Sequence, residues 1–183
     1  MTVATIGHST RAIEKFIELL RAHGIEQLVD IRTIPRSRHN PQYNRETLPA
    51  ELAAHDIRYL HLPELGGLRH ARSDSPNTGW RNLSFRGFAD YMQTPDFEAG
   101  IATLIQLAGE HPTAIMCAEA VSWRCHRSLV ADALAVRGIP VQHIQSIGKA
   151  SPHQLTSFAC VRGTAIVYQD SAKPRHLDGP TLF

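Results

Sequence analysis

The sequence has few lysines, few cysteines and no long apolar run, and each shortage excludes a class of protein. Only 3 of its 19 basic residues are lysine and the other 16 are arginine, with a formal net charge of +2. A net charge this small gives no argument for binding to nucleic acid or to a membrane surface. Three cysteines in 183 residues do not make a disulfide-stabilised secreted domain. No run of about 18 apolar residues occurs, so we expect no membrane-spanning helix.

The first residues and the overall composition fit a cytoplasmic globular protein. The start, MTVATIGHST, lacks the charged segment and long apolar core of a signal peptide. Hydrophobic residues make up 43% of the chain and charged residues 20%, which is ordinary for a globular domain. A length of 183 residues is enough for one domain with a sizeable core. We therefore expect a single cytoplasmic domain without a membrane partner, and the sequence leaves its oligomeric state open.

Short apolar runs alternate with helical patterns over most of the chain, which predicts an α/β fold. We expect strands at residues 3–6, 28–31, 57–62, 113–116 and 141–144. Helices are expected at residues 13–20, 46–55, 85–91, 97–108 and 126–137. Strands that alternate with helices form parallel sheets covered on both sides. The prediction is one α/β domain with a mostly parallel sheet of about five strands and helices on both faces.

The pattern weakens near the carboxyl end. We predict an α/β domain over residues 1–145 and a C-terminal extension, residues 146–183, packed on the same domain. Within the extension, Ser151-Pro152 is a candidate start of a short helix and residues 164–168 a candidate late strand. The alternative fold is an α+β arrangement in which that late strand joins the sheet antiparallel.

Polar residues gather in the loops that leave the predicted strands, whereas the loops that enter the strands are short. The polar loops cover residues 7–11, 30–38, 64–72 and 117–127. In open α/β sheets ligands bind outside the carboxyl ends of the strands. Helix N-termini also meet there and offer free backbone donors to an anion. The sequence therefore predicts one functional site at this edge of the sheet.

The loop over residues 32–45 holds four arginines, one histidine and no carboxylate. Like charges this dense are costly unless solvent screens them or an anion joins them. Arginine presents a planar fork that matches phosphate and carboxylate. We predict an anion-binding site made of His8, Ser9, Arg32, Arg36, Arg38 and Arg127. The alternatives are a solvated arginine loop and, for His8 and Ser9, a helix cap beside a hydrogen-bonded histidine.

The richest stretch runs from Cys117 to Ser128. A thiol near a helix N-terminus and close to arginine is expected to have a lowered pKa, and a neighbouring carboxylate or imidazole can move protons. We predict catalytic roles for Cys117, Glu119, Cys125 and His126. The stretch is similar to phosphatase and sulfurtransferase loops, but six residues rather than five separate Cys117 from Arg124.

Three other interpretations of this stretch stay open. Cys117, Glu119, Cys125 and His126 offer soft and borderline ligands to zinc or iron, but seven residues between the cysteines is not a standard metal spacing, so no metal site is predicted. The two cysteines are also candidates for a reversible disulfide. Alternatively, Cys117 is only a small buried apolar residue.

Asp30, Gly66 and Gly67 are predicted to support the site. Asp30 ends a predicted strand and is expected to form an ion pair with Arg32 or Arg127, although an acid–base role is open. The glycine pair allows a positive φ or a close backbone approach to a ligand, and a plain turn is the alternative. No G-x-G-x-x-G, Walker A or H-E-x-x-H motif occurs, so the sequence gives no support for a nucleotide cofactor or a zinc protease.

Two functions follow from these residues. The first is an enzyme that acts on a small phosphorylated or otherwise anionic ligand, such as a nucleotide, with thiol-dependent catalysis. The second is a non-catalytic nucleic-acid-binding module, in which aromatic residues between the arginines stack on exposed bases. The candidate stacking residues are Tyr43, Trp80, Phe85 and Trp123.

The same residues carry a resemblance to a known family. The sequence resembles the bacterial and archaeal domain-of-unknown-function family 488. The matching pieces are Thr5-Ile6-Gly7-His8-Ser9, Leu28-Val29-Asp30-Ile31-Arg32, Pro35-Arg36-Ser37-Arg38, Leu65-Gly66-Gly67, Cys117-Ala118-Glu119 and Cys125-His126-Arg127-Ser128. The resemblance implies one domain with these positions as its signature, and it implies no activity, substrate or cofactor.

Overall fold

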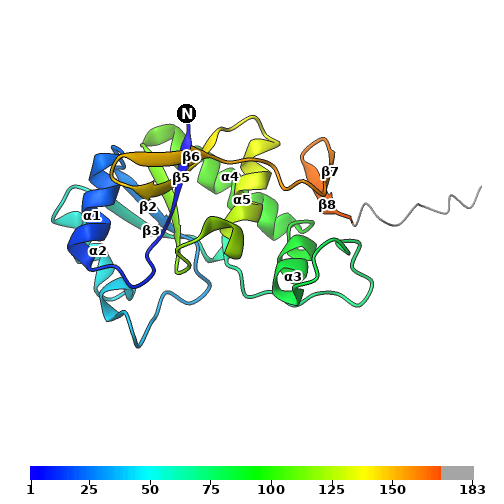
Figure 1. The fold of residues 1–183 in the computed structure, drawn as a ribbon, viewed down its shortest axis with the longest axis horizontal. Helices are drawn as coiled ribbons and strands as arrows, with labels where there is room; N and C mark the ends of the chain where they lie inside the picture. Colours follow the sequence, from blue (N-terminus) through cyan, green and yellow to red (C-terminus); the bar gives the residue numbers. More distant parts are fainter. Residues whose placement is uncertain (170–183) are drawn as a thin grey trace, which may run out of the picture.

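A computed structural model describes residues 1–169 and confirms the predicted α/β architecture (Figure 1). Its central sheet has six strands where about five were expected, in the order β3-β2-β4-β1-β5-β6. The strands are β1 (Val3–Gly7), β2 (Gln27–Asp30), β3 (Arg58–His61), β4 (Thr113–Cys117), β5 (Val141–Ser146) and β6 (Lys149–Pro152). The first five run parallel, and β6 runs antiparallel to β5.

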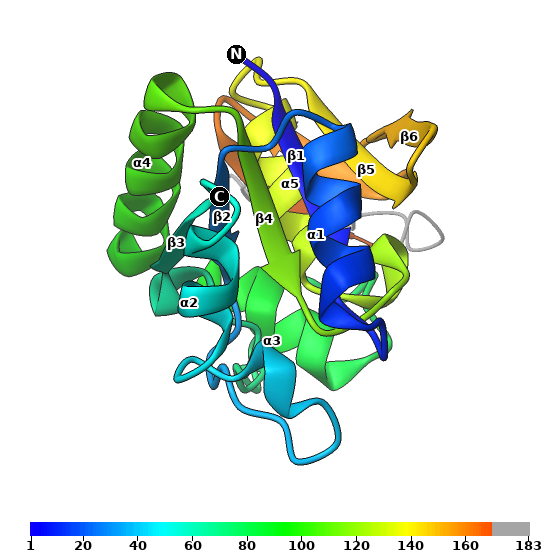
Figure 2. The same cartoon turned by 90° about the vertical axis from the view of Figure 1, so that its left-hand side faces the viewer.

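Helices cover both faces of this sheet, as the apolar strands predict. They are α1 (Ile13–Ala22), α2 (Leu48–Ala53), α3 (Leu83–Tyr91), α4 (Pro95–Glu110) and α5 (Arg127–Ala135). Leu28 and Met116 point into a core formed with α1 and α2, whereas Val29 and Ile115 point into a second core formed with α3, α4 and α5. Successive strand residues face opposite sides, so each strand supplies both cores. Figure 2 shows α1 in front of the sheet and α5 behind it.

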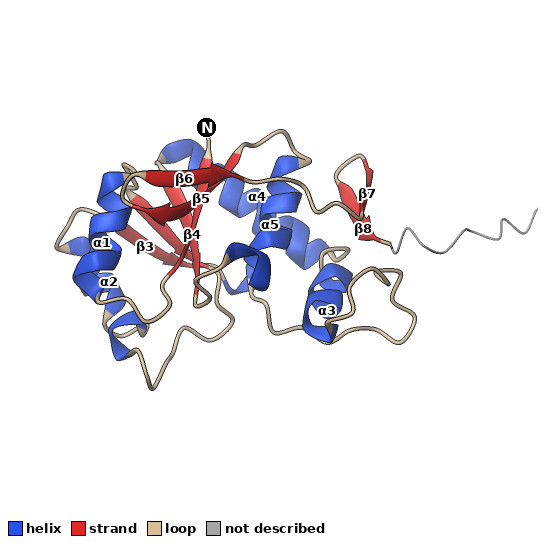
Figure 3. Cartoon of the chain, in the orientation of Figure 1, coloured by secondary structure: helices blue, strands red, loops and turns tan. Residues whose placement is uncertain are grey.

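The late strand expected near the carboxyl end is present, but the expected helix start at Ser151-Pro152 and the alternative α+β arrangement are wrong. Ser151 and Pro152 lie in β6 rather than at a helix start, because a two-residue turn after β5 lets the chain fold back antiparallel. The late strand, β8 (Ala165–Tyr168), does not join the main sheet but pairs with β7 (Ala159–Arg162) in a separate two-stranded sheet (Figure 3). Pro152 is tolerated because it ends an edge strand.

Within the C-terminal extension, β6 joins the main sheet and β8 packs on the α3, α4 and α5 side of the domain. Ile166 and Tyr168 are buried in that core, and the Tyr168 hydroxyl donates a hydrogen bond to Asp132 in α5 at 2.8 Å. Residues 170–183 of the predicted extension lie outside the described residues. None of the helices within residues 1–169 combines the length and apolar character needed to cross a bilayer.

The position of the site follows from how the chain leaves β1 and β4, which are neighbours in the sheet. After β1 the chain enters α1 on one face, and after β4 it enters α5 on the opposite face. Where adjacent parallel strands send their connections to opposite sides, a crevice opens at their carboxyl ends, and ligands of α/β proteins bind there.

Candidate functional site

A cavity of about 640 Å³ lies at the carboxyl ends of β1, β2 and β4. Segments distant in the sequence meet there because Gly7 pairs with Cys117 and Asp30 pairs with Met116 in the parallel sheet. Nine of the predicted site residues line this cavity: His8, Ser9, Arg32, Arg36, Gly67, Cys117, Glu119, Cys125 and His126. The predicted convergence of these loops at one edge of the sheet is therefore present in the fold.

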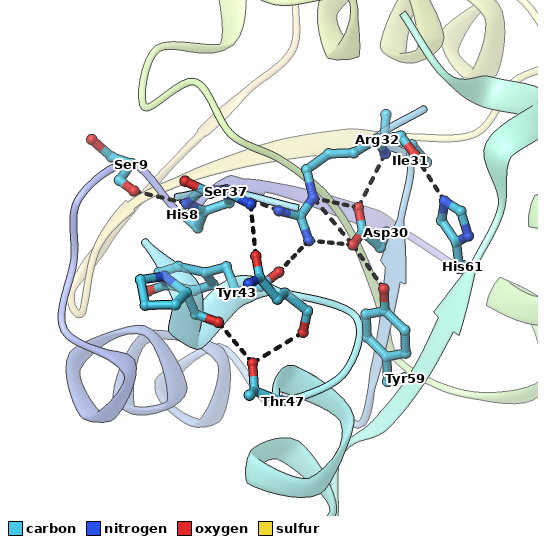
Figure 4. A network of polar contacts seen from close by, with 12 residues as sticks. His8, Ser9, Asp30, Ile31, Arg32, Ser37, Tyr43, Thr47, Tyr59 and His61 are labelled. Carbon is cyan, nitrogen blue, oxygen red and sulfur yellow. Dashed lines mark hydrogen bonds and ion pairs between the residues drawn. The ribbon is translucent and has the colours of Figure 1, made fainter. Parts of the chain in front are cut away.

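Arg32, which lines the cavity, forms a buried ion pair with Asp30 (Figure 4). Arg32 donates from Nε and a terminal nitrogen to the Asp30 carboxylate, at 2.9 Å and 2.6 Å. The same carboxylate accepts from the Tyr59 hydroxyl at 2.8 Å, and the same terminal nitrogen of Arg32 donates to the Tyr43 carbonyl at 2.7 Å. Burial alone would lower the pKa of Arg32, but the bond with Asp30 outweighs it and the pKa lies above its ordinary value. Most hydrogen-bond donors of the Arg32 guanidinium are thus occupied by groups of the protein itself.

His8 lines the cavity but carries no positive charge. Burial lowers its pKa to about 4, with a further contribution from Arg32. Its ring stacks on Tyr43 with the centroids 4.1 Å apart. Nδ1 lies 2.7 Å from the Ser9 carbonyl, which can only accept, so Nε2 is left to accept from Arg32 at 3.3 Å. His8 therefore positions Arg32 rather than binding an anion by charge.

The remaining predicted anion ligands divide into two groups. Arg36 is exposed and lines the cavity, together with Ser9, Ser37 and Asn40. Arg38 lies on the same loop but does not reach the cavity. The arginine loop thus contributes Arg36 as its freely available guanidinium at the cavity wall.

Arg127 is the most unusual charge of the site. It is 1% exposed and forms no ion pair with any carboxylate among residues 1–169. One terminal nitrogen donates to the carbonyls of Glu119 and Ala120 at 2.6 Å and 3.5 Å, and the Nε atom has no partner. Asp30, a predicted partner, pairs with Arg32 instead. Since a buried unpaired cation is costly, Arg127 calls for a negative group nearby.

Cys117, Cys125 and His126 form a compact cluster in the cavity wall. One ligand atom from each lies within 4.8 Å of the others. His126 Nδ1 is 3.6 Å from the Cys125 sulfur and 3.9 Å from the Cys117 sulfur. The hydrogen bond from the Cys117 thiol, with His126 and Arg127 nearby, holds the pKa of Cys125 well below its ordinary value. The same hydrogen bond and burial raise the pKa of Cys117. Both cysteines are free rather than joined in a disulfide.

The imidazole of His126 is held from three sides. Its Nε2 lies 3.1 Å from the Ile31 carbonyl, so Nε2 carries the hydrogen and Nδ1 faces the sulfurs. The Phe88 ring packs edge-on against it at 5.1 Å. A Cβ at Gly67 would lie 2.4 Å from Nδ1, so only glycine leaves room for the ring. Gly66 has the same role against Thr33. Both glycines serve close packing, and neither has a positive φ.

Glu119 is exposed on the cavity wall, and its carboxylate is not part of the Cys–His cluster. Arg124, which follows Cys117 at the spacing noted in the sequence, is also exposed and lines the cavity. Both residues therefore belong to the exposed wall of the cavity and not to the Cys–His cluster.

Comparison with family models decides the family. The model described as "Domain of unknown function DUF488" matches residues 12–134, which is more than half of the chain. The chain belongs to the DUF488 family. No curated protein and no solved structure matches it.

A second polar network in this DUF488 chain was not found from the sequence. Thr5 lies 2.8 Å from His143 Nδ1, His143 Nε2 lies 3.0 Å from His153 Nδ1, and His153 Nε2 lies 2.8 Å from Asp132. Two of its members line a further cavity of about 530 Å³. Asp132 lies among the apolar buried residues of α5, and His153 lies in the C-terminal extension, where the sequence pattern is weak. No sequence signal therefore joined them.

Proposed function

We propose that this DUF488 chain binds a small ligand carrying a phosphate or carboxylate group in the 640 Å³ cavity, and that the Cys–His cluster in the wall acts on that ligand. One observation carries the proposal. Three arginines line the cavity, namely Arg32, Arg36 and Arg124, against a single carboxylate, that of Glu119. Asp30 neutralises Arg32, but behind the wall the buried Arg127 adds a positive charge that has no carboxylate partner among residues 1–169. The cavity is therefore an enclosure with an excess of positive charge.

The arginines contribute unequally to this proposal. Arg32 is paired with the Asp30 carboxylate and donates to the Tyr43 carbonyl, so its charge is neutralised within the protein and it is not free to clamp a ligand. Arg36 is exposed at the wall with Ser37 and Asn40 beside it. Its guanidinium is free to form a two-pronged hydrogen bond with an anionic group. We infer that Arg36 is the main ligand-binding cation.

The arrangement of the aromatic residues gives less support to a nucleic-acid-binding module. Tyr43 is fully buried. Trp80 stacks on Phe85 with the ring centroids 4.7 Å apart and contacts Phe158 at 4.9 Å. Of the four candidate stacking residues, Trp123 alone is largely exposed, at 70%. One exposed ring does not make a stacking surface for successive bases.

The test compares Arg36→Gln with Arg38→Gln, because both arginines are exposed on one loop and only Arg36 lines the cavity. Binding of inorganic phosphate and of a nucleoside monophosphate is measured by isothermal titration calorimetry on the full chain. A hydrogen bond to a charged group contributes about 1.5–3 kcal/mol, so R36Q is expected to weaken binding roughly 10- to 100-fold. R38Q is expected to bind as the wild type does.

Equal weakening in both variants would show that the loop acts through its overall charge and not through the cavity. Absence of measurable binding of either probe to the wild-type chain at low salt would reject the anionic ligand. Thermal unfolding of each variant checks that neither substitution changes the fold.

A further inference from the structure

The sulfurs of Cys117 and Cys125 and the Nδ1 of His126 are three metal-ligating atoms that meet in one wall of the cavity. They come from the end of β4 and from the residues just before α5, and seven residues separate the two cysteines in the sequence. That spacing is not a known metal motif, so the sequence does not indicate a metal. The fold brings the three atoms together because the 117–126 loop returns to the strand end from which it left.

The two nitrogen–sulfur distances within the cluster match the edges of a zinc coordination tetrahedron. Zinc binds thiolate sulfur at about 2.3 Å and imidazole nitrogen at about 2.0–2.1 Å in tetrahedral geometry. Sulfur and nitrogen ligands of one ion are then about 3.6 Å apart. His126 Nδ1 lies 3.6 Å from the Cys125 sulfur and 3.9 Å from the Cys117 sulfur. The two sulfurs lie within 4.8 Å of each other, against about 3.8 Å for two thiolates of one tetrahedral zinc ion. The nitrogen–sulfur distances therefore need shifts of at most a few tenths of an ångström, and the sulfurs need to approach each other by at most about 1 Å.

The imidazole is already in the form that binds a metal. The bond from Nε2 to the Ile31 carbonyl, at 3.1 Å, fixes the proton on Nε2 and leaves the Nδ1 lone pair directed at the sulfurs. Ligating histidines in proteins are held in this way by a second hydrogen bond from the other ring nitrogen. Packing by Phe88 and Gly67 prevents the ring from turning away.

We propose that Cys117, Cys125 and His126 bind a zinc ion whose fourth coordination position opens into the cavity. Two thiolates and one imidazole with an open position form a ligand set of catalytic rather than structural zinc. Glu119, the nearest candidate from the sequence for a fourth ligand, lies outside the cluster and faces the cavity. The open position therefore remains for water or for an oxygen of the ligand.

The charge of such a centre leaves Arg127 without a compensating negative group. Two thiolates neutralise the zinc ion, so the buried Arg127 cation remains in excess beside it. This excess favours an anionic group at the open position, and for that role the inference rests on the proposed function. Zinc bound there supplies a Lewis acid that polarises a phosphate or carboxylate oxygen, or a bound water of lowered pKa.

The experiment measures metal in the full chain expressed with added zinc and purified without chelator. We expect about one equivalent of zinc per chain by inductively coupled plasma mass spectrometry. After exchange for cobalt(II), we expect thiolate-to-cobalt charge-transfer absorption in the near ultraviolet and strong visible bands of a tetrahedral ion. Cys125→Ser and His126→Ala are expected to lose both signals, whereas Cys160→Ser, which changes an exposed cysteine outside the cluster, keeps them.

Measuring both zinc content and phosphate binding separates this inference from the proposed function. R36Q is expected to keep its zinc while it loses phosphate affinity, because Arg36 is not part of the cluster. If the cluster variants do not fold, the cobalt spectrum of the wild-type chain still reports whether thiolates are ligands. Zinc content far below one equivalent together with no charge-transfer band would overturn the metal site. Phosphate binding retained in that case would leave the anionic ligand in place.

Discussion

Asp30 and Arg32 lie two residues apart and bind each other through two nitrogens of the guanidinium, with 0% and 7% of their side chains exposed. Removing one partner of a buried ion pair leaves an unpaired charge and costs about 3–5 kcal/mol. Asp30→Ala is therefore expected to lower the free energy of unfolding by about that amount, measured by urea denaturation. The Tyr59 hydroxyl also loses its acceptor.

The matched control for this substitution is Asp74→Ala. Asp74 pairs with Arg72 at 2.7 Å, but both side chains are largely exposed, and an exposed pair contributes about 0–1 kcal/mol. Comparable losses in the two variants would contradict the structural role assigned to Asp30.

Gly67→Ala is expected to disturb the Cys–His cluster through the position of one ring. The added Cβ would lie 2.4 Å from His126 Nδ1, and the ring must move from its contacts with Ile31 and Phe88. Overpacking of this kind costs about 1–3 kcal/mol. The measurement is urea unfolding, followed by the zinc content of the purified variant, which is expected to fall.

Gly109→Ala serves as the control for the glycine substitution. Gly109 lies in α4 with no atom within 4 Å of an added Cβ, and alanine in a helix is favoured over glycine by up to about 1 kcal/mol. Its stability is expected to rise slightly, with zinc content unchanged. A Gly67→Ala chain as stable as the wild type would show that the close contact is relieved without cost.

Removal of the metal is expected to change the reactivity of the three cysteines differently. Cys117 and Cys125 are 8% and 4% exposed, whereas Cys160 is exposed. Iodoacetamide labelling of the zinc-loaded chain should mark Cys160 first. After treatment with a chelator, labelling of Cys117 and Cys125 is expected to accelerate while that of Cys160 stays constant. Peptide mapping by mass spectrometry reads each site, and an unchanged pattern for all three would speak against a thiolate-bound metal.

The second polar network predicts a pH dependence of stability. Burial lowers the pKa of His143 to about 4, with His153 and Arg127 acting in the same direction and Asp132 opposing them. The unfolded chain therefore binds a proton near pH 6.5 that the folded chain rejects until about pH 4. The stability associated with His143 is present above pH 6.5 and is lost as the pH falls toward 4.

The comparison uses His143→Gln and His55→Gln across pH 4 to 7.5, with His55 chosen because it is exposed. Urea unfolding at each pH gives the free energy of unfolding, and the slope of that free energy against pH is compared between variants. The slope of H143Q is expected to be flatter than that of the wild type, and that of H55Q unchanged. Since H143Q also loses two hydrogen bonds, the slopes and not the absolute stabilities are compared. A wild-type slope in H143Q would reject the assignment.

Local patterns were sufficient to predict most of the architecture. The apolar run at residues 113–116 indicated a buried strand, and the stripe of Phe16, Ile17 and Leu20 indicated one face of a helix, and both are present. The ends of those elements fixed the edge where the site lies, because parallel strands share one carboxyl edge. The errors lay where the pattern was weak, at β6 and at the β7–β8 pair.

The different environments of the arginines could not be predicted from the sequence. Arg32, Arg36, Arg38 and Arg127 are equivalent in the sequence as fixed positive charges. In the fold Arg32 is committed to Asp30, Arg38 does not reach the cavity, and Arg127 is buried behind it. Arg32, for example, is held by partners 2, 11 and 24 positions away in the chain, and the charge pattern alone does not show which guanidinium is free.

The sequence by itself determined the alternation of strands and helices, the gathering of polar loops at one edge of the sheet and the residue types of the site. These properties depend on the period of apolar residues and on the chain direction of a parallel sheet. Only the tertiary structure decided that His126 turns Nδ1 to both sulfurs, since the carbonyl and the glycine that orient its ring come from Ile31 and Gly67. These contacts join residues that are far apart in the sequence. They depend on how the loops pack against one another, which a local sequence pattern does not predict.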